Sequence, residues 1–229
     1  MFDQFLWVTL PYIVLTIFIG GHIYRYQNDQ FGWTSKSSEL LEKKLLRLGS
    51  NLFHWGIIFV FGGHVMGLLI PIGVYERMSV SEHQYHMIAL IGGIPAGIAA
   101  TIGIFILLYR RMTVRRLIAT STKGDWVSLI CLLIVILSGM SATFSNIDSQ
   151  GFDYRTTIGP WLRGILTFRA DPSLLIDVPV WFKIHVLAVF GLVAAWPFTR
   201  LVHVFSVPVR YLTRSYVIYR KRRPMNEDL

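Results

Sequence analysis

Four of the seven histidines in this 229-residue chain lie inside long apolar stretches. His54 and His64 share one stretch, and His185 and His203 share another. Ionisable side chains at membrane depth are rare and usually functional. A single such histidine is as often a simple hydrogen-bond link between helices, but four of them confined to two stretches favour a role as metal ligands. Imidazole nitrogens are well suited to bind iron or other transition metals.

Depth in the membrane predicts how the four histidines pair. If the two stretches are antiparallel helices, His54 and His203 both lie within about 5 Å of one boundary. His64 and His185 then lie about 10–12 Å from the other boundary. Two imidazoles that face each other at equal depth are suited to be the axial ligands of one haem iron. The sequence therefore predicts two b-type haems, an inner one on His54 and His203 and an outer one on His64 and His185.

The spacing of the histidines also predicts their helix faces. His185 and His203 are separated by about five helical turns, which places them on one face of a continuous helix. His54 and His64 are ten residues apart, so their side chains point in directions about 80° apart around the helix axis. The helix that carries them is therefore expected to tilt, to bend or to offer the two haems different faces.

Small residues surround His64. Gly62, Gly63 and Gly67 would allow a planar group to approach the helix, although plain helix–helix packing uses the same residues. No cysteine or carboxylate accompanies either histidine pair at membrane depth, which disfavours zinc. The only cysteine, Cys131, excludes an internal disulfide and reads as a small buried residue.

Arginines are expected at the inner edge of the bundle. Arg110, Arg111 and Arg200 are predicted to be cationic partners of haem propionates. The positive-inside rule would place arginines there for topological reasons as well.

The elements that must position these histidines are membrane helices. The chain is 53% hydrophobic with 15% charged residues, whereas soluble domains have about a quarter charged. Five stretches approach the roughly 20 apolar residues that cross a bilayer. We predict an all-α bundle of five transmembrane helices, forming one domain over residues 1–229, with spans at about Phe5–Tyr24, Asn51–Ile72, Tyr85–Tyr109, Trp126–Asn146 and Val178–Phe205. The first stretch lacks a basic region ahead of it and a cleavage pattern after it, so it is expected to remain as a helix.

The net charge of +9 comes from lysines and arginines whose positions along the chain are typical of membrane topology rather than of nucleic-acid binding. Of the 22 lysines and arginines, 17 lie within Arg25–Arg47, Arg110–Lys123 and Arg200–Arg223. With five spans, this bias predicts the N-terminus outside and the C-terminus in the cytoplasm. The basic segment Arg220–Arg223 could contact anionic lipid or an acidic partner, with a solvated end as an equal alternative.

Two loops carry further signals. In the loop Arg25–Gly49, Ser37 and Ser38 precede a Glu- and Lys-rich run, which predicts a capped amphipathic helix and a cytoplasmic docking surface. In the outer loop Ile147–Asp177, the run Pro160–Phe168 predicts a short helix in the membrane interface.

The motifs together resemble the gamma subunit of membrane-bound respiratory nitrate reductase. The likeness covers nearly the whole chain and rests on Asn51-Leu52-Phe53-His54, Gly63-His64, Gly92-Gly93, His185, Phe198-Thr199-Arg200-Leu201-Val202-His203, the run Ser206–Arg214 and Ser37-Ser38. The resemblance implies a di-haem cytochrome b in the bacterial cytoplasmic membrane. It also implies two cytoplasmic partners, an iron–sulfur subunit and a molybdenum-containing subunit in which nitrate becomes nitrite. Quinol would be oxidised near the outer haem, and electrons would pass through the inner haem to the iron–sulfur partner.

The quinol site departs from the family pattern. Some members have a lysine at the start of the third helix, where this chain has Gln84 between His83 and His86. A different quinol, such as menaquinol, or a different proton acceptor would account for the change, since histidine titrates near neutral pH. The predicted quinol-site residues are Gly63, His64, Gln84 and His86. An ordinary interfacial role for the two histidines is the alternative, and His22 is interpreted as structural.

Two other functions remain open. A second reading within the same chemistry is a di-haem anchor of another oxidoreductase, such as a formate dehydrogenase or a heterodisulfide-reductase-like complex, and partner co-purification would separate these. A haem-free transporter or assembly scaffold would be colourless. The paired Gly/Pro-interrupted segments typical of transporters are not evident in the sequence.

Overall fold

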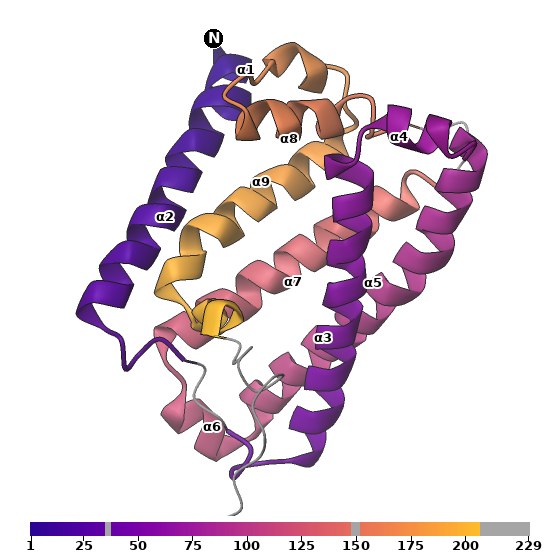
Figure 1. Cartoon of the computed structure of the whole chain (residues 1–229). Coiled ribbons are helices and arrows are strands. Elements are labelled where there is room, and N and C mark those ends of the chain that lie inside the picture. The colour runs from indigo at the N-terminus through magenta and orange to yellow at the C-terminus, as the bar shows by residue number, and fades with distance from the viewer. Residues whose placement is uncertain (35–37, 148–151, 207–229) are drawn as a thin grey trace, which may run out of the picture.

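The computed structural model describes residues 1–34, 38–147 and 152–206. Those residues form helices and connecting turns without strands (Figure 1). Five helical segments are long and apolar enough to cross a membrane. The predicted all-α bundle is confirmed, and the chain is a multi-pass membrane protein.

The five spans follow the predicted stretches but differ at their ends. The first combines α1 (Phe2–Gln4), η1 (Phe5–Thr9) and α2 (Leu10–Asn28), and the second combines α3 (Lys44–His64) and η2 (Val65–Leu69). The others are α5 (Glu82–Thr113), α7 (Lys123–Phe144), and α9 (Val180–Ala195) with η4 (Trp196–Phe198).

Capping boxes determine where two of the spans begin. Ser81 and Gln84 cap α5 reciprocally, and Thr122 and Asp125 do the same for α7. Each box satisfies two backbone N–H groups that have no partner within the helix. These polar boxes extend both helices beyond their apolar stretches, which explains why α5 and α7 begin three residues before the hydropathy pattern predicts.

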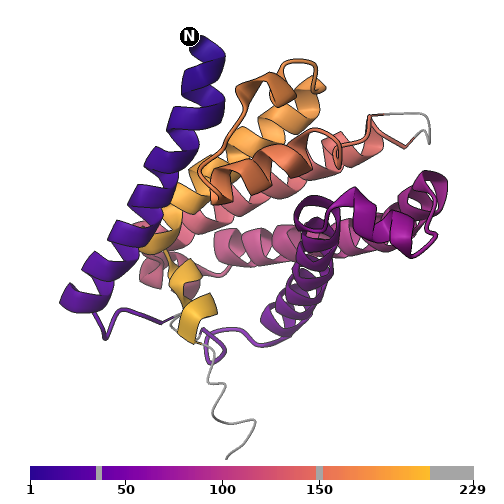
Figure 2. The same ribbon diagram turned by 45° about the horizontal axis from the view of Figure 1, so that its top comes forward.

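The spans are arranged as a series of neighbours. α3 packs against α5, α5 against α7, α7 against α9, and α9 against α2. Figures 1 and 2 show α3 and α2 at opposite ends of this series. The two histidine-bearing helices, α3 and α9, are therefore held mainly by α5 and α7 rather than by direct packing on each other.

Small residues bring α3 and α5 into close contact. A Cβ added at Gly56 would lie 2.5 Å from the Ala100 backbone nitrogen and 2.7 Å from the Ala96 carbonyl oxygen. The two backbones consequently approach more closely than any larger residue would permit, which is how membrane helices pack without a hydrophobic driving force.

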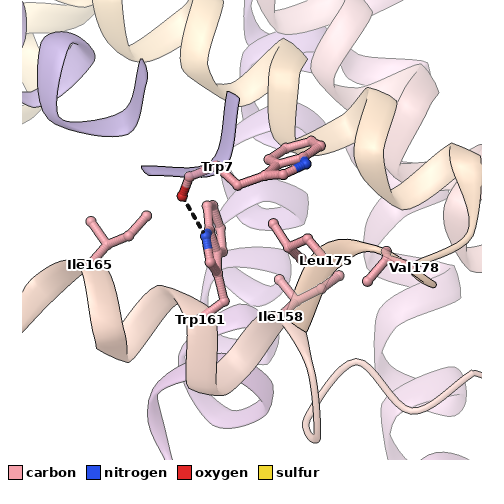
Figure 3. Close-up of a cluster of buried hydrophobic side chains, with 6 residues drawn as sticks. All are labelled: Trp7, Ile158, Trp161, Ile165, Leu175 and Val178. Atoms are coloured by element: carbon pink, nitrogen blue, oxygen red, sulfur yellow. Dashed lines mark hydrogen bonds between the residues drawn. The ribbon is translucent and has the colours of Figure 1, made fainter. Parts of the chain in front are cut away.

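The described part of the connection between α7 and α9 folds over the end of the bundle where the N-terminus lies. It forms α8 (Ile158–Leu166) and η3 (Pro172–Leu175), with α4 (Ile72–Arg77) at the same end (Figure 1). Trp161 of α8 packs edge-on against Trp7 and donates its indole N–H to the Trp7 carbonyl at 2.8 Å (Figure 3). Ile158, Ile165, Leu175 and Val178 complete this buried cluster. The predicted short helix in this loop is confirmed, beginning two residues earlier than Pro160.

Two predictions about local structure are wrong. The fifth helix ends at Ala195 rather than at Phe205, because Pro197 cannot continue the backbone hydrogen bonding, and His203 lies on the separate η5 (Arg200–Ser206). His185 and His203 therefore do not share a face of one helix. No helix begins at Ser38 either, since α3 begins at Lys44. Ser37, the segment Arg220–Arg223 and all but the first residue of the run Ser206–Arg214 lie outside the described residues.

Replacing Gly56 with leucine should separate α3 from α5. Overpacking a close contact costs about 1–3 kcal/mol, so the thermal unfolding temperature of the detergent-purified protein should fall clearly. Gly20→Leu is the matched control, because a Cβ at Gly20 meets no other protein atom within 4 Å. Equal stability of the two variants would contradict this packing.

Candidate functional site

The first histidine pair joins α3 to the segment after the fifth span. The ring centroids of His54 and His203 are 6.3 Å apart, with an interplanar angle of 72°. His54 Nδ1 lies 2.7 Å from the Ser50 carbonyl oxygen, and His203 Nδ1 lies 2.7 Å from that of Arg200. Each ring is thus tied to its own helical segment.

The second pair joins α3 to α9 nearer the other end of the bundle. The centroids of His64 and His185 are 6.0 Å apart and the rings are inclined by 40°. His64 Nδ1 lies 2.7 Å from the Val60 carbonyl oxygen. His185 Nδ1 lies 3.1 Å from the Val135 carbonyl oxygen and 3.1 Å from Ser138 Oγ, both on α7.

These contacts determine the tautomer of all four imidazoles. A carbonyl oxygen can only accept a hydrogen bond, so Nδ1 carries the proton and Nε2 presents its lone pair. Metal-binding histidines have the same arrangement, in which the second nitrogen donates to a carbonyl and orients the ring. Within the described part of the chain, no hydrogen bond engages Nε2 of any of the four.

The separation of the rings fits an iron between them. With metal–nitrogen bonds of about 2 Å and about 1.1 Å from each nitrogen to its ring centre, two opposed imidazoles have centroids about 6 Å apart. The observed 6.3 and 6.0 Å agree with this value. Among the described residues, no larger group of His, Cys, Asp or Glu gathers as a metal site. The structure brings the histidines together in the two pairs that their depths predict.

The glycines near the pairs play different parts. A Cβ added at Gly62, Gly63 or Gly191 would meet no other protein atom within 4 Å, so these positions leave room for a flat group. Gly67 is instead covered, because its Cβ would lie 2.7 Å from the Tyr154 ring and 2.8 Å from Tyr85 Oη. Gly67 therefore serves protein packing rather than access to His64.

Gly139 is a site residue that the sequence reasoning missed. A Cβ there would lie 2.9 Å from Cε1 of His185, so the glycine leaves space for the ring while Ser138 contacts its Nδ1. Two small residues on α7 thus position a histidine on α9. The sequence signal is weak, since glycine and serine are common in membrane helices.

The three arginines predicted as propionate partners differ in their burial and in their contacts with the rest of the protein. Arg110 is almost fully buried, and it donates to the Glu42 carboxylate at 2.7 Å and to Ser38. Arg111 is also buried and contacts Ser121 and Asp125. Arg200 is partly exposed and has one long ion pair with Asp125, at 3.4 Å. Arg200 is the most exposed of the three side chains.

The ionised Glu42 carboxylate explains why Arg110 binds within the protein rather than to another group. Desolvation alone raises the pKa of the Glu42 carboxyl, but hydrogen bonds from the Leu45 amide, from Arg110 and from the Leu46 amide outweigh it. The pKa is therefore held below its ordinary value, and the carboxylate binds Arg110 and the start of α3 together. This contact fastens the first inner loop to the end of α5.

The predicted quinol residues on α5 lie at the end of the bundle where the N-terminus and α4 lie. The Gln84 side-chain oxygen accepts the Ser81 N–H within the capping box, so that atom has a structural role. His86 Nε2 lies 3.2 Å from the Ile147 carbonyl oxygen. His86 also lines a small pocket with Glu82, Tyr85, Phe152, Asp153, Tyr154 and Arg155.

A buried polar cluster connects this pocket to α3. Arg155 binds Asp153 through two hydrogen bonds of 2.9 Å and stacks on the Tyr85 ring at 4.1 Å. Burial raises the pKa of Tyr154, whose hydroxyl lies 3.5 Å from that of Tyr85. Both tyrosines cover Gly67, so the cluster begins within one turn of His64 and reaches the outer loop.

His22 remains outside both pairs. Its Nδ1 lies 2.6 Å from the Phe18 carbonyl oxygen, and its ring is packed against Phe18, Trp33 and Phe205. Its Nε2 is buried without a hydrogen-bond partner among the described residues, and the structural role stays a prediction.

Known proteins resemble this chain over almost its full length. A family model described as "Nitrate reductase gamma subunit" matches residues 3–222. The "Nitrate reductase gamma chain" of Bacillus subtilis is 63% identical over 97% of this chain and 100% of its own length. The "Respiratory nitrate reductase 2 gamma chain" of Escherichia coli is 38% identical over 96% of this chain and 98% of its own length. The "Nitrate reductase-like protein NarX" of Mycobacterium tuberculosis is 39% identical over 98% of this chain but 35% of its own length.

Substituting Arg155 with methionine should loosen the outer polar cluster. Arg155 and Asp153 are 5% and 18% exposed, and removing one partner of such a pair costs about 3 kcal/mol because the other charge stays desolvated. The thermal unfolding temperature should fall, and the outer loop should become more sensitive to protease. Arg77→Met, which removes an exposed arginine at the same end, is the control. Unchanged stability of Arg155→Met would show that the pair contributes nothing.

Proposed function

Because the chain belongs to the family of nitrate reductase gamma subunits, we propose that it is the quinol-oxidising cytochrome b subunit of a respiratory nitrate reductase. The observation that carries the proposal is the presence of two imidazole pairs with centroids 6.3 and 6.0 Å apart and with all four Nδ1 atoms at carbonyl oxygens. That arrangement is suited to two six-coordinate b haems, whereas a haem-free transporter or scaffold would need the histidines only as links between helices.

Each histidine has one task in this proposal. His54 and His203 hold the inner haem, and His64 and His185 hold the outer one, each through Nε2. A bound b haem supplies one-electron transfer. Carbonyl oxygens on α3, α7 and η5 keep the imidazoles in the ligating tautomer. Arg200 is retained as a propionate partner, whereas Arg110 and Arg111 are buried and ion-paired with Glu42 and Asp125.

The charge pattern supports one orientation. The inner ends of α5 and α7 and the short α6 (Arg115–Thr120) between them carry Arg110, Arg111, Arg116 and Lys123. The N-terminus, α4 and α8 lie at the opposite end of the bundle (Figure 1). We therefore assign the basic end to the cytoplasm and the N-terminus to the outside, in the cytoplasmic membrane of a bacterium.

Quinol oxidation is assigned to the outer end. Gly63 leaves space beside His64, and His86 lies in the polar pocket with Glu82 at the start of α5. An imidazole in contact with the outer aqueous side can accept a quinol proton and release it there. The Gln84 oxygen is engaged in the capping box, but its amide nitrogen can still donate to a quinol oxygen. Menaquinol is one candidate substrate.

The names of the relatives support a complex with other subunits, since a gamma chain is one subunit of an enzyme. We assign to this complex the two cytoplasmic partners that the resemblance to the family implies, an iron–sulfur subunit and a molybdenum-containing subunit that reduces nitrate. The inner pair lies at the cytoplasmic end, from which an electron can leave toward the iron–sulfur subunit. Co-purification with subunits of another oxidoreductase would support the alternative anchor role.

The haem content of the purified protein tests the ligand assignment. A reduced-minus-oxidised visible spectrum should give a b-type band, with two haems per chain. His54→Leu or His203→Leu should remove one haem, and His64→Leu or His185→Leu should remove the other, because each haem would lose one of the two imidazoles that hold it. His83→Leu should retain both. A colourless wild-type protein would overturn the proposal, and any of the four substitutions that left two haems would overturn its ligand assignment.

The rate of quinol oxidation tests the role of His86. His86→Phe should reduce the quinol-dependent reduction of the haems by about 100-fold, since general base catalysis contributes on that scale. Chemical reduction by dithionite should still reduce both haems fully. Gln84→Glu, which preserves the capping oxygen, tests the second residue separately. If His86→Phe retained the wild-type rate with a menaquinol analogue, the proton acceptor would lie elsewhere.

A further inference from the structure

The helix of the fifth span ends before it reaches the inner histidine. α9 stops at Ala195, η4 covers Trp196–Phe198, and Thr199 is extended before η5 begins at Arg200. The position of His203 is therefore not determined by the axis of α9. Other elements must hold the segment that carries it.

Arg25, at the inner end of α2, contacts the break directly. Its Nη1 donates to the carbonyl oxygens of Pro197 and Thr199, each at 2.7 Å, and its Nη2 donates to that of Gly32 at 2.7 Å. Buried carbonyls need partners when a helix ends. One guanidinium thus satisfies two carbonyls on either side of the break and fixes the direction in which the chain continues.

Asp125 holds the same segment from α7. Its carboxylate forms ion pairs with Arg200 at 3.4 Å and with Arg111 at 3.3 Å, while it also caps the first turn of α7. Arg200 in turn provides the carbonyl oxygen that lies 2.7 Å from His203 Nδ1. Asp125 is therefore connected to the imidazole through a single residue.

The packing around the break leaves little room for adjustment. A Cβ at Gly21 of α2 would lie 2.8 Å from Cβ of Pro197, and one at Gly124 of α7 would lie 3.1 Å from the Phe198 carbonyl oxygen. Both helices approach the segment through a glycine. The two polar contacts consequently act on a segment that α2 and α7 already enclose.

We infer that Arg25 and Asp125 are positioning residues for His203, which set the orientation of its imidazole and thereby the reduction potential of the inner haem. The inference rests on the proposed function, because it takes His203 to be an iron ligand. Ring orientation and hydrogen bonding of an axial histidine are known to tune haem potential. Neither residue touches the inner pair, so their effect is exerted through the backbone and Arg200.

The test measures each haem separately in the purified complex. Arg25→Met should shift the midpoint potential of the inner haem and its low-spin electron paramagnetic resonance signal, while the outer haem is unchanged. Arg25→Lys keeps the charge but not the forked donor and should restore the signals in part. Asp125→Asn keeps an oxygen for the α7 cap and loses both ion pairs, so it should shift the inner haem alone. Arg116→Met, on the exposed face of α6, is the control for loss of an inner arginine.

The possible results separate the inference from the proposed function. If the inner-haem signals of both Arg25→Met and Asp125→Asn were identical to wild type, the inference would be overturned. Two haems per chain in the same samples would still support the proposed function. Equal changes in both haems would also overturn it, since they indicate general destabilisation. If Arg25→Met failed to accumulate, Asp125→Asn and Arg25→Lys would decide by the same criteria. A wild-type complex without haem would overturn the proposed function itself.

Discussion

The hydrogen bond between each imidazole Nδ1 and a backbone carbonyl is the interaction on which the proposed chemistry depends. On α3 the acceptors are the carbonyls one turn earlier, of Ser50 and Val60, so the helix itself orients both rings. On the opposite side the acceptors come from η5 and from α7. The bundle must therefore fix the relation of α7 to α9, and of η5 to its surroundings, before either pair has ligating geometry.

Several helices together fix these positions. α5 approaches α3 through Gly56, and α7 approaches the His185 ring through Gly139, so small residues set the distances across the bundle. At the end of the bundle away from the N-terminus, Arg25 and Asp125 hold the segment that follows the break in the fifth span. The helices that carry none of the four paired histidines, α2, α5 and α7, are therefore as important to the candidate site as those that do.

Much of the fold followed from the sequence, because hydropathy and charge report directly on membrane spans and equal depth restricts which histidines can meet. The break after Ala195 was not foreseen, although Pro197 is the local signal for it. The break also affects which faces of α3 the histidines His54 and His64 must occupy. Since His203 leaves the axis of α9, the angular mismatch between His54 and His64 needs no bend in α3. Arg110 and Arg111 were predicted to be partners of haem propionates, and only the tertiary contacts with Glu42 and Asp125 reveal that the protein itself engages them. Gly139 carries no distinctive signal in sequence.

Both histidine pairs connect the second span to the fifth or to the segment just beyond it. During synthesis, α3 enters the membrane with two half-sites whose partners have not yet left the ribosome. Neither pair can form until the fifth span has been inserted and has packed on α7. If the proposed haems bind there, their insertion follows the packing of the fifth span and joins it to the second.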